Sequence, residues 1–144
     1  MERATRIYVP KWALVLYAII AIGLIPWIFN LAANLPTRHL VHHWDAVWVG
    51  FDVIMFLTLG LTIVLAFKKL VWVAMSATAL ATLFIVDAWF DVLTSRPGKD
   101  QKEAIIFGIL ELLLAGLTLR FVRQVVRSST NTDKNIQLVT NAKK

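Results

Sequence analysis

The chain has 144 residues, of which 58% are hydrophobic, and it carries a formal net charge of +6 at pH 7. Soluble domains are only about one half apolar, so we expect the surplus apolar surface to face lipid. The sequence has no cysteine, which excludes disulfides, thiol redox chemistry, iron–sulfur ligation and thiolate zinc sites. Its basic residues lie at the termini and in loops, without a basic helix face interleaved with aromatic residues, so nucleic-acid binding is not indicated.

Four apolar segments follow one another, each about long enough to cross a hydrocarbon core of ~30 Å. The predicted spans cover residues 12–35, 46–67, 70–93 and 104–126. They predict an all-α polytopic membrane protein, a four-transmembrane-helix bundle formed by residues 1–127. Residues 128–144 are polar and rich in Asn, Thr and Lys, and we expect them to form a disordered cytoplasmic tail.

The distribution of Lys and Arg predicts how the bundle is oriented. The N-terminus, the turn at Lys68 and Lys69 and the C-terminal end together carry more basic residues than the other two loops. The positive-inside rule then predicts a multi-pass protein of the cell membrane with both termini in the cytoplasm, N-in/C-in. We expect its partners to be the lipid bilayer and either further copies of the chain or a partner membrane protein.

Acidic residues inside three spans are predicted to lie at one depth. Asp52 and Asp87 are each about six residues from the outer end of their spans, and Glu111 is about seven residues in, or roughly 9–10 Å at 1.5 Å per residue. Asp91 follows Asp87 by one helical turn on the same face. The predicted ion- or proton-binding residues are therefore Asp52, Asp87, Asp91 and Glu111.

The loop before the second span is predicted to form the mouth of this site. Its residues with suitable chemistry are Asp45, Arg38, His42 and His43, and the tryptophans nearest the acids, expected to line the site, are Trp48 and Trp89. The ordinary alternatives are interfacial loop histidines and an aromatic belt at the membrane surface.

Several carboxylates that share one pocket cannot all remain ionised unless a proton or cation joins them. The candidates are a proton, a hard cation on oxygen ligands, a transition metal that recruits His42 or His43, or Arg38 as an internal counter-ion. We therefore expect an outward-facing intramembrane acidic site that binds or translocates a cation or proton, as in a transporter or channel, with no catalytic residues.

Two alternatives stay open. The first is a non-catalytic bundle that binds a partner membrane protein or lipid, with its acids held by Trp, Thr and Arg38 as interhelical packing contacts. The second, less favoured, is an intramembrane metalloenzyme acting on lipid, which would need His42 or His43 near Asp45 or Asp91. The cofactor stays open, with a bound cation as the candidate; retinal and haem are not expected, because the spans have no central Lys and no central His.

The segments WDAVWVGFD and DAWFDVLT resemble a family of small bacterial four-span membrane proteins. The motif residues are Trp44, Asp45, Trp48, Gly50, Phe51 and Asp52, then Asp87, Trp89, Phe90 and Asp91. The likeness extends from the first span to the fourth. It implies the four-span fold and carries no expectation about activity.

Overall fold

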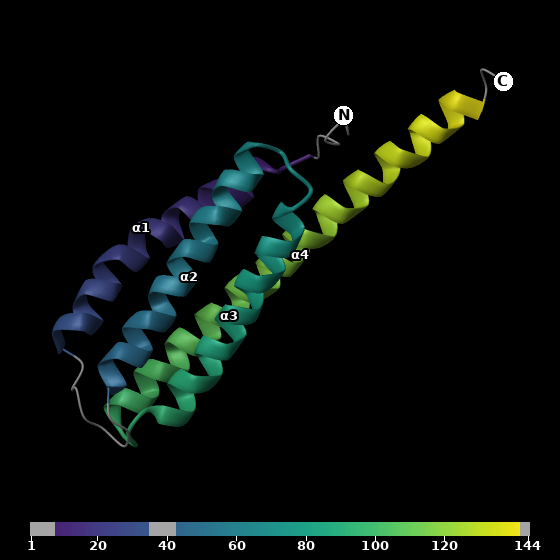
Figure 1. The fold of residues 1–144 in the computed structure, drawn as a ribbon. Helices are drawn as coiled ribbons and strands as arrows, with labels where there is room; N and C mark the ends of the chain where they lie inside the picture. The colour runs from purple at the N-terminus through teal and green to yellow at the C-terminus, as the bar shows by residue number, and fades with distance from the viewer. Residues whose placement is uncertain (1–7, 35–42, 142–144) are drawn as a thin grey trace.

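The computed structural model describes residues 8–34 and 43–141, with residues 131–140 described by their backbone alone. These residues form four helices: α1 (Lys11–Asn34), α2 (Trp44–Phe67), α3 (Val73–Thr94) and α4 (Lys99–Asn141). The helices alternate in direction, so the end of α1, the start of α2, the end of α3 and the start of α4 lie together at one end of the bundle (Figure 1). The predicted all-α, four-helix architecture is confirmed for the described residues.

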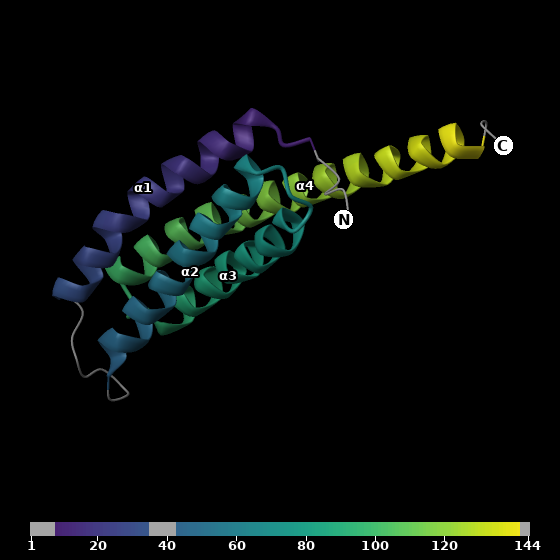
Figure 2. The same ribbon diagram turned by 45° about the horizontal axis from the view of Figure 1, so that its top comes forward.

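All four helices are long and apolar enough to cross a membrane. The first three match the predicted spans to within a few residues. The fourth differs, because α4 continues as one helix to Asn141 and passes beyond the other three helices (Figures 1 and 2). The span predicted for residues 104–126 lies within this helix, whereas the segment expected to be disordered is helical as far as Asn141. Beyond Gly116 the sequence has neither Pro nor Gly, so no residue there interrupts the helix.

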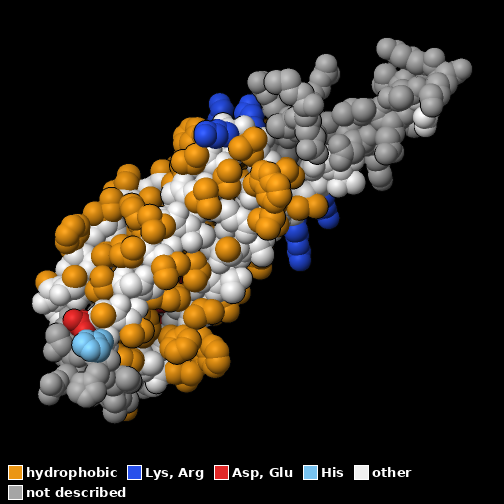
Figure 3. Space-filling model, viewed as in Figure 1, with side chains coloured by type: hydrophobic (Ala, Val, Ile, Leu, Met, Phe, Trp, Pro, Cys, Tyr) orange, Lys and Arg blue, Asp and Glu red, His pale blue; other side chains and the backbone are white. Residues whose placement is uncertain are grey.

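The outer faces of the helices carry large apolar side chains. Ile22, Phe29 and Leu57 are 71%, 72% and 64% exposed. Figure 3 shows hydrophobic side chains over most of one face, with Lys and Arg toward the end from which α4 extends and a histidine and an acidic side chain toward the other. An apolar belt between two polar ends is the surface expected of a bundle surrounded by lipid.

The closest packing is between α3 and α4. A Cβ atom at Gly108 would lie 3.4 Å from both the Ala88 carbonyl oxygen and Val92 Cγ2, so the missing side chain allows the two backbones to approach. By contrast, α1 packs mainly on α2 and reaches α4 through aromatic rings. The ring centroids of Trp27 and Phe107 are 5.6 Å apart, and those of Tyr17 and Phe121 are 5.7 Å apart.

The interior of the bundle is layered along its length. One buried layer is apolar and includes Met55, Leu59, Leu80 and Phe84. Toward the end that bears the α2–α3 turn lies a layer of hydroxyl groups. There Thr62 and Ser76 share a buried hydrogen bond of 2.6 Å between α2 and α3. Such contacts hold membrane helices together because lipid offers polar groups no alternative partner.

Candidate functional site

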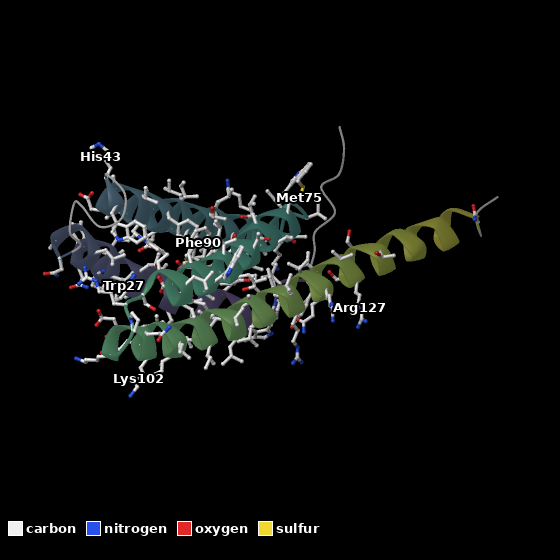
Figure 4. The ribbon with its side chains drawn as sticks, turned by 90° about the horizontal axis from the view of Figure 1, so that it is seen from below. Trp27, His43, Met75, Phe90, Lys102 and Arg127 are labelled. Carbon is white, nitrogen blue, oxygen red and sulfur yellow. The ribbon has the colours of Figure 1, made fainter. Side chains whose placement is uncertain are left out.

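A cavity of about 690 Å³ lies between the helices near the end where α3 passes into α4. It is lined by residues from all four helices and by Ser95 and Arg96 of the α3–α4 connection, so it opens at that end. Figure 4 shows Trp27, His43 and Lys102 toward this end and Met75 and Arg127 toward the other. Its volume and its carboxyl groups make this cavity the first place to look for a ligand.

Three carboxyl groups meet in the wall of this cavity. Asp87, Asp91 and Glu111 each offer one oxygen, and these oxygens all lie within 4.8 Å of one another. We call these three residues the acidic cluster. Asp87 and Asp91 share a face of α3 because they are one turn apart. Glu111 is one turn from Gly108, so the close approach of α4 to Ala88 brings the Glu111 carboxyl to the Asp87 carboxyl.

Asp52 adds a fourth carboxyl group to the same cavity, from α2. Its side chain is only 3% exposed, and its Oδ2 atom has no hydrogen-bond partner among the described residues. Oε2 of Glu111 is likewise without a partner there. A buried carboxylate oxygen without a donor is costly, so these two atoms are placed to receive a group that the described residues do not supply.

The other predicted site residues divide into those that line the cavity, those that do not, and those outside the described residues. Trp48 lines the cavity, as do the acidic cluster and Asp52. Trp89 and Asp45 do not line it: Trp89 is 63% exposed and packs against Phe90, and Asp45 is partly buried beside the cavity end. Exposed His43 adopts a left-handed conformation (φ 61°) just before α2 and also lies outside the lining.

Arg38 and His42 lie outside the described residues, so their predicted place at the mouth is not described. Trp89 lies away from the cavity for a simple reason. It is two residues from Asp87, which places it about 200° around the helix, on the opposite face. Prediction from nearness in sequence ignored this rotation.

The structure also adds lining residues that the sequence prediction missed. Asp100 and Glu103, in the first turns of α4, stand at the mouth in place of Asp45. The cavity also has an aromatic wall, to which α1, α2 and α4 add rings that were not predicted. The wall consists of Trp27, Trp44, Trp48, Phe84 and Phe107. Counting residues along the span, as was done for Glu111, could also have placed Asp100 and Glu103 at the mouth. Nothing in the sequence pairs Trp27 with Phe107, because which helix faces meet is set by tertiary packing.

The charge of the lining is strongly asymmetric. Among the described residues, its carboxyl groups belong to Asp52, Asp87, Asp91, Asp100, Glu103 and Glu111, and a guanidinium belongs to Arg96. Lys99, next to the mouth, forms an ion pair with Glu103 at 3.6 Å. The field in the cavity therefore attracts cations and repels anions.

The acidic cluster has the dimensions of a site for a hard cation. Two oxygens that bind one Ca²⁺ at 2.3–2.6 Å are at most about 5 Å apart, and the spread of 4.8 Å in the cluster falls within this limit. The described group holds carboxylates and no histidine, a ligand set that suits hard cations better than zinc or copper. A proton shared between two carboxyls would need two of these oxygens at about 2.5–2.7 Å, closer than a shared metal ion requires.

Comparisons with protein-family models, with curated proteins and with solved structures give no significant match for this chain. The arrangement of the site therefore carries the functional argument by itself.

Proposed function

We propose that this chain is a multi-pass protein of the cell membrane whose cavity binds, and exchanges with the exterior, a cation or proton. The observation that carries the proposal is the meeting of three carboxyl groups from two helices within 4.8 Å, beside the buried and unpartnered Asp52. At an effective dielectric constant of about 20, two carboxylates 4.8 Å apart repel by about 3.5 kcal/mol. A proton or cation removes that repulsion.

The proposed orientation places the cavity on the extracytoplasmic side. Lys11 begins α1 and Lys68 and Lys69 follow α2, so they lie at the end opposite the cavity, and Arg127 of α4 lies toward that end as well (Figure 4). The cavity end carries fewer basic residues, Arg96, Lys99 and Lys102, with Arg38 in the other loop of the sequence at that end. The positive-inside rule favours the cytoplasm for the first end, which leaves both termini in the cytoplasm and the cavity facing out.

The apolar layer beneath the acids suggests exchange from one side in this conformation. Met55, Leu59, Leu80 and Phe84 are nearly fully buried and separate the cavity from the hydroxyl layer at Thr62. Passage across the membrane would require these side chains to part. A complete pathway across the membrane would require an additional copy of the chain or a partner protein.

Of the two alternatives, a purely structural role for the acids has less support. It would give Asp52 and Glu111 hydrogen-bond donors from indole or hydroxyl groups, yet one oxygen of each has none among the described residues. A metalloenzyme has less support still. Among the described residues, His43 lies outside the cavity lining and the carboxylate group includes no histidine; His42 lies outside the described residues.

The experiment is ion binding and flux with the full chain reconstituted in liposomes. Binding of ⁴⁵Ca²⁺ and ²²Na⁺ and release of protons are measured for the wild type, Asp87→Asn and Glu111→Gln. The matched control is Asp45→Asn, which removes a carboxyl from the same helix as Asp52 but outside the cavity. We expect binding in the wild type and control and its loss in the two cluster variants. Equal behaviour of all four proteins would refute the proposal.

A further inference from the structure

The cavity is much larger than the acidic cluster requires. A metal ion with its oxygen ligands fits within a few ångströms of the cluster, whereas the cavity has about 690 Å³, inside the range of roughly 300–1,000 Å³ typical of sites for drug-sized molecules. Most of the space lies against apolar side chains such as Leu24, Leu31, Met55 and Leu114. Contact with these apolar side chains would not stabilise a hydrated inorganic ion.

Aromatic rings line the same space as the carboxyl groups. Trp44 and Trp48 stand edge to face with centroids 5.7 Å apart on α2, and Trp27 and Phe107 approach to 5.6 Å between α1 and α4. The faces of aromatic rings attract organic cations, most strongly where water is excluded. Carboxylates and tryptophans around one apolar volume are complementary to a molecule that is both positively charged and lipophilic.

The cavity also reaches the lipid-facing surface between α1 and α4. Trp27, Phe107 and Leu110 line the cavity and yet are 42%, 44% and 51% exposed. The backbones of α1 and α4 are not tightly packed here, since the two helices meet through rings. Glu111 lies one turn from Phe107 on α4. A molecule dissolved in the outer half of the bilayer thus meets a carboxyl group directly behind this aromatic pair.

We propose that the cavity binds a lipophilic organic cation that enters from the bilayer between α1 and α4. Its charge lies at the acidic cluster and Asp52, and its apolar body lies among Trp27, Trp48 and Phe107. This inference rests on the proposed function and specifies its ligand. A zwitterionic phospholipid is a poorer occupant, because the phosphate next to its amine would meet the carboxyl-rich lining. Protons and the organic cation compete for the same carboxyl groups, so binding releases protons.

The test uses tetraphenylphosphonium and tetraphenylborate, which have nearly the same shape and opposite charges. Equilibrium dialysis of radiolabelled tetraphenylphosphonium is performed with the full chain in nanodiscs, with empty nanodiscs as the blank. We expect saturable binding that is lost in Asp87→Asn and is accompanied by proton release. Tetraphenylborate is dialysed in a separate experiment, because the two ions form a sparingly soluble salt, and it should show no saturable binding. Non-saturable uptake of the cation, or equal saturable binding of the anion, would overturn the inference.

Two variants test the aromatic wall. Trp48→Leu and Phe107→Leu keep apolar bulk and remove the ring, and we expect each to weaken binding, Trp48→Leu by about tenfold, which corresponds to about 1.4 kcal/mol. The matched control, Trp89→Leu, alters an exposed ring outside the cavity and should leave the dissociation constant unchanged. Circular dichroism and gel filtration establish that each variant is folded. Full affinity in both folded wall variants would contradict the inference.

The binding of ⁴⁵Ca²⁺ and protons by the same nanodiscs separates the two proposals. Wild-type protein that binds either of these through the acidic cluster but takes up no tetraphenylphosphonium overturns the organic-cation inference and leaves the proposed function intact. Wild-type protein that binds none of the probes overturns both.

Discussion

Replacing Asp52 by leucine should make the bundle more stable while removing its function. Asp52 is 3% exposed, and its Oδ2 atom has no hydrogen-bond partner among the described residues. A buried polar atom left unpaired costs about 1–3 kcal/mol. Leucine has no such atom, and its larger side chain can extend into the cavity of about 690 Å³ that Asp52 lines.

The expected gain in the free energy of unfolding is therefore about 1–3 kcal/mol for Asp52→Leu. No hydrophobic gain is added, because the lipid that would surround the leucine in separated helices is equally apolar. The matched control is Thr62→Val, on the same buried face of α2. Thr62 shares a hydrogen bond of 2.6 Å with Ser76, and interhelical hydrogen bonds in membranes contribute about 0.6 kcal/mol on average and up to about 1.7 kcal/mol. The control should lose stability by that amount.

The assay is reversible unfolding in mixed micelles of a mild detergent and dodecyl sulfate, followed by circular dichroism. The two substitutions are predicted to move the unfolding midpoint in opposite directions. If Asp52→Leu destabilises the protein as Thr62→Val does, Asp52 contributes to packing as an ordinary interhelical contact. That result would falsify the argument that its carboxylate awaits an external ligand.

Three further predictions address the cluster, the packing and the orientation. A cation that binds the acidic cluster should raise the unfolding free energy of the wild type by about 2.7 kcal/mol at one hundred times its dissociation constant; a Glu111→Gln protein that gains as much would place the ion elsewhere. Gly108→Leu should cost about 1–3 kcal/mol by separating α3 from α4, whereas Gly116→Leu, where an added Cβ meets nothing within 4 Å, should change stability little; equal losses in thermal unfolding would contradict this account of the close approach. Because the chain has no cysteine, Lys99→Cys and Lys68→Cys each introduce a unique thiol, and an impermeant maleimide should label the first in intact cells and the second only after permeabilisation; the reverse pattern would invert the proposed orientation.

Most of the fold could be predicted from the sequence because span length and apolar composition are fixed by bilayer thickness. The end of α4 could not be predicted in this way. Polar composition beyond residue 127 indicated disorder, but a helix that has already formed extends at little cost where no Pro or Gly interrupts it. The helix therefore continues to Asn141.

The candidate site was partly predictable for the same kind of reason. Counting residues along the helices gave Asp52, Asp87 and Glu111 a common depth, because the rise per residue of an α-helix is nearly constant. The rotation of each helix about its axis depends on its neighbours, so Trp27 and Phe107 could not be assigned to the cavity. The prediction that Trp89 lines the site failed for a different reason. Its angle around the helix from Asp87 can be calculated from the sequence alone, and it points to the opposite face.

The unbroken length of α4 has a mechanical consequence. At 1.5 Å per residue this helix is about 65 Å long, more than twice the thickness of a hydrocarbon core of ~30 Å, and it contains no proline. Glu111 lies about 18 Å from its first residue and about 45 Å from its last. If α4 tilts by about 5° about a point near Glu111, its C-terminal end moves by about 4 Å, because that end lies about 45 Å away. A tilt that begins at this carboxyl group is therefore largest at the far end of the helix.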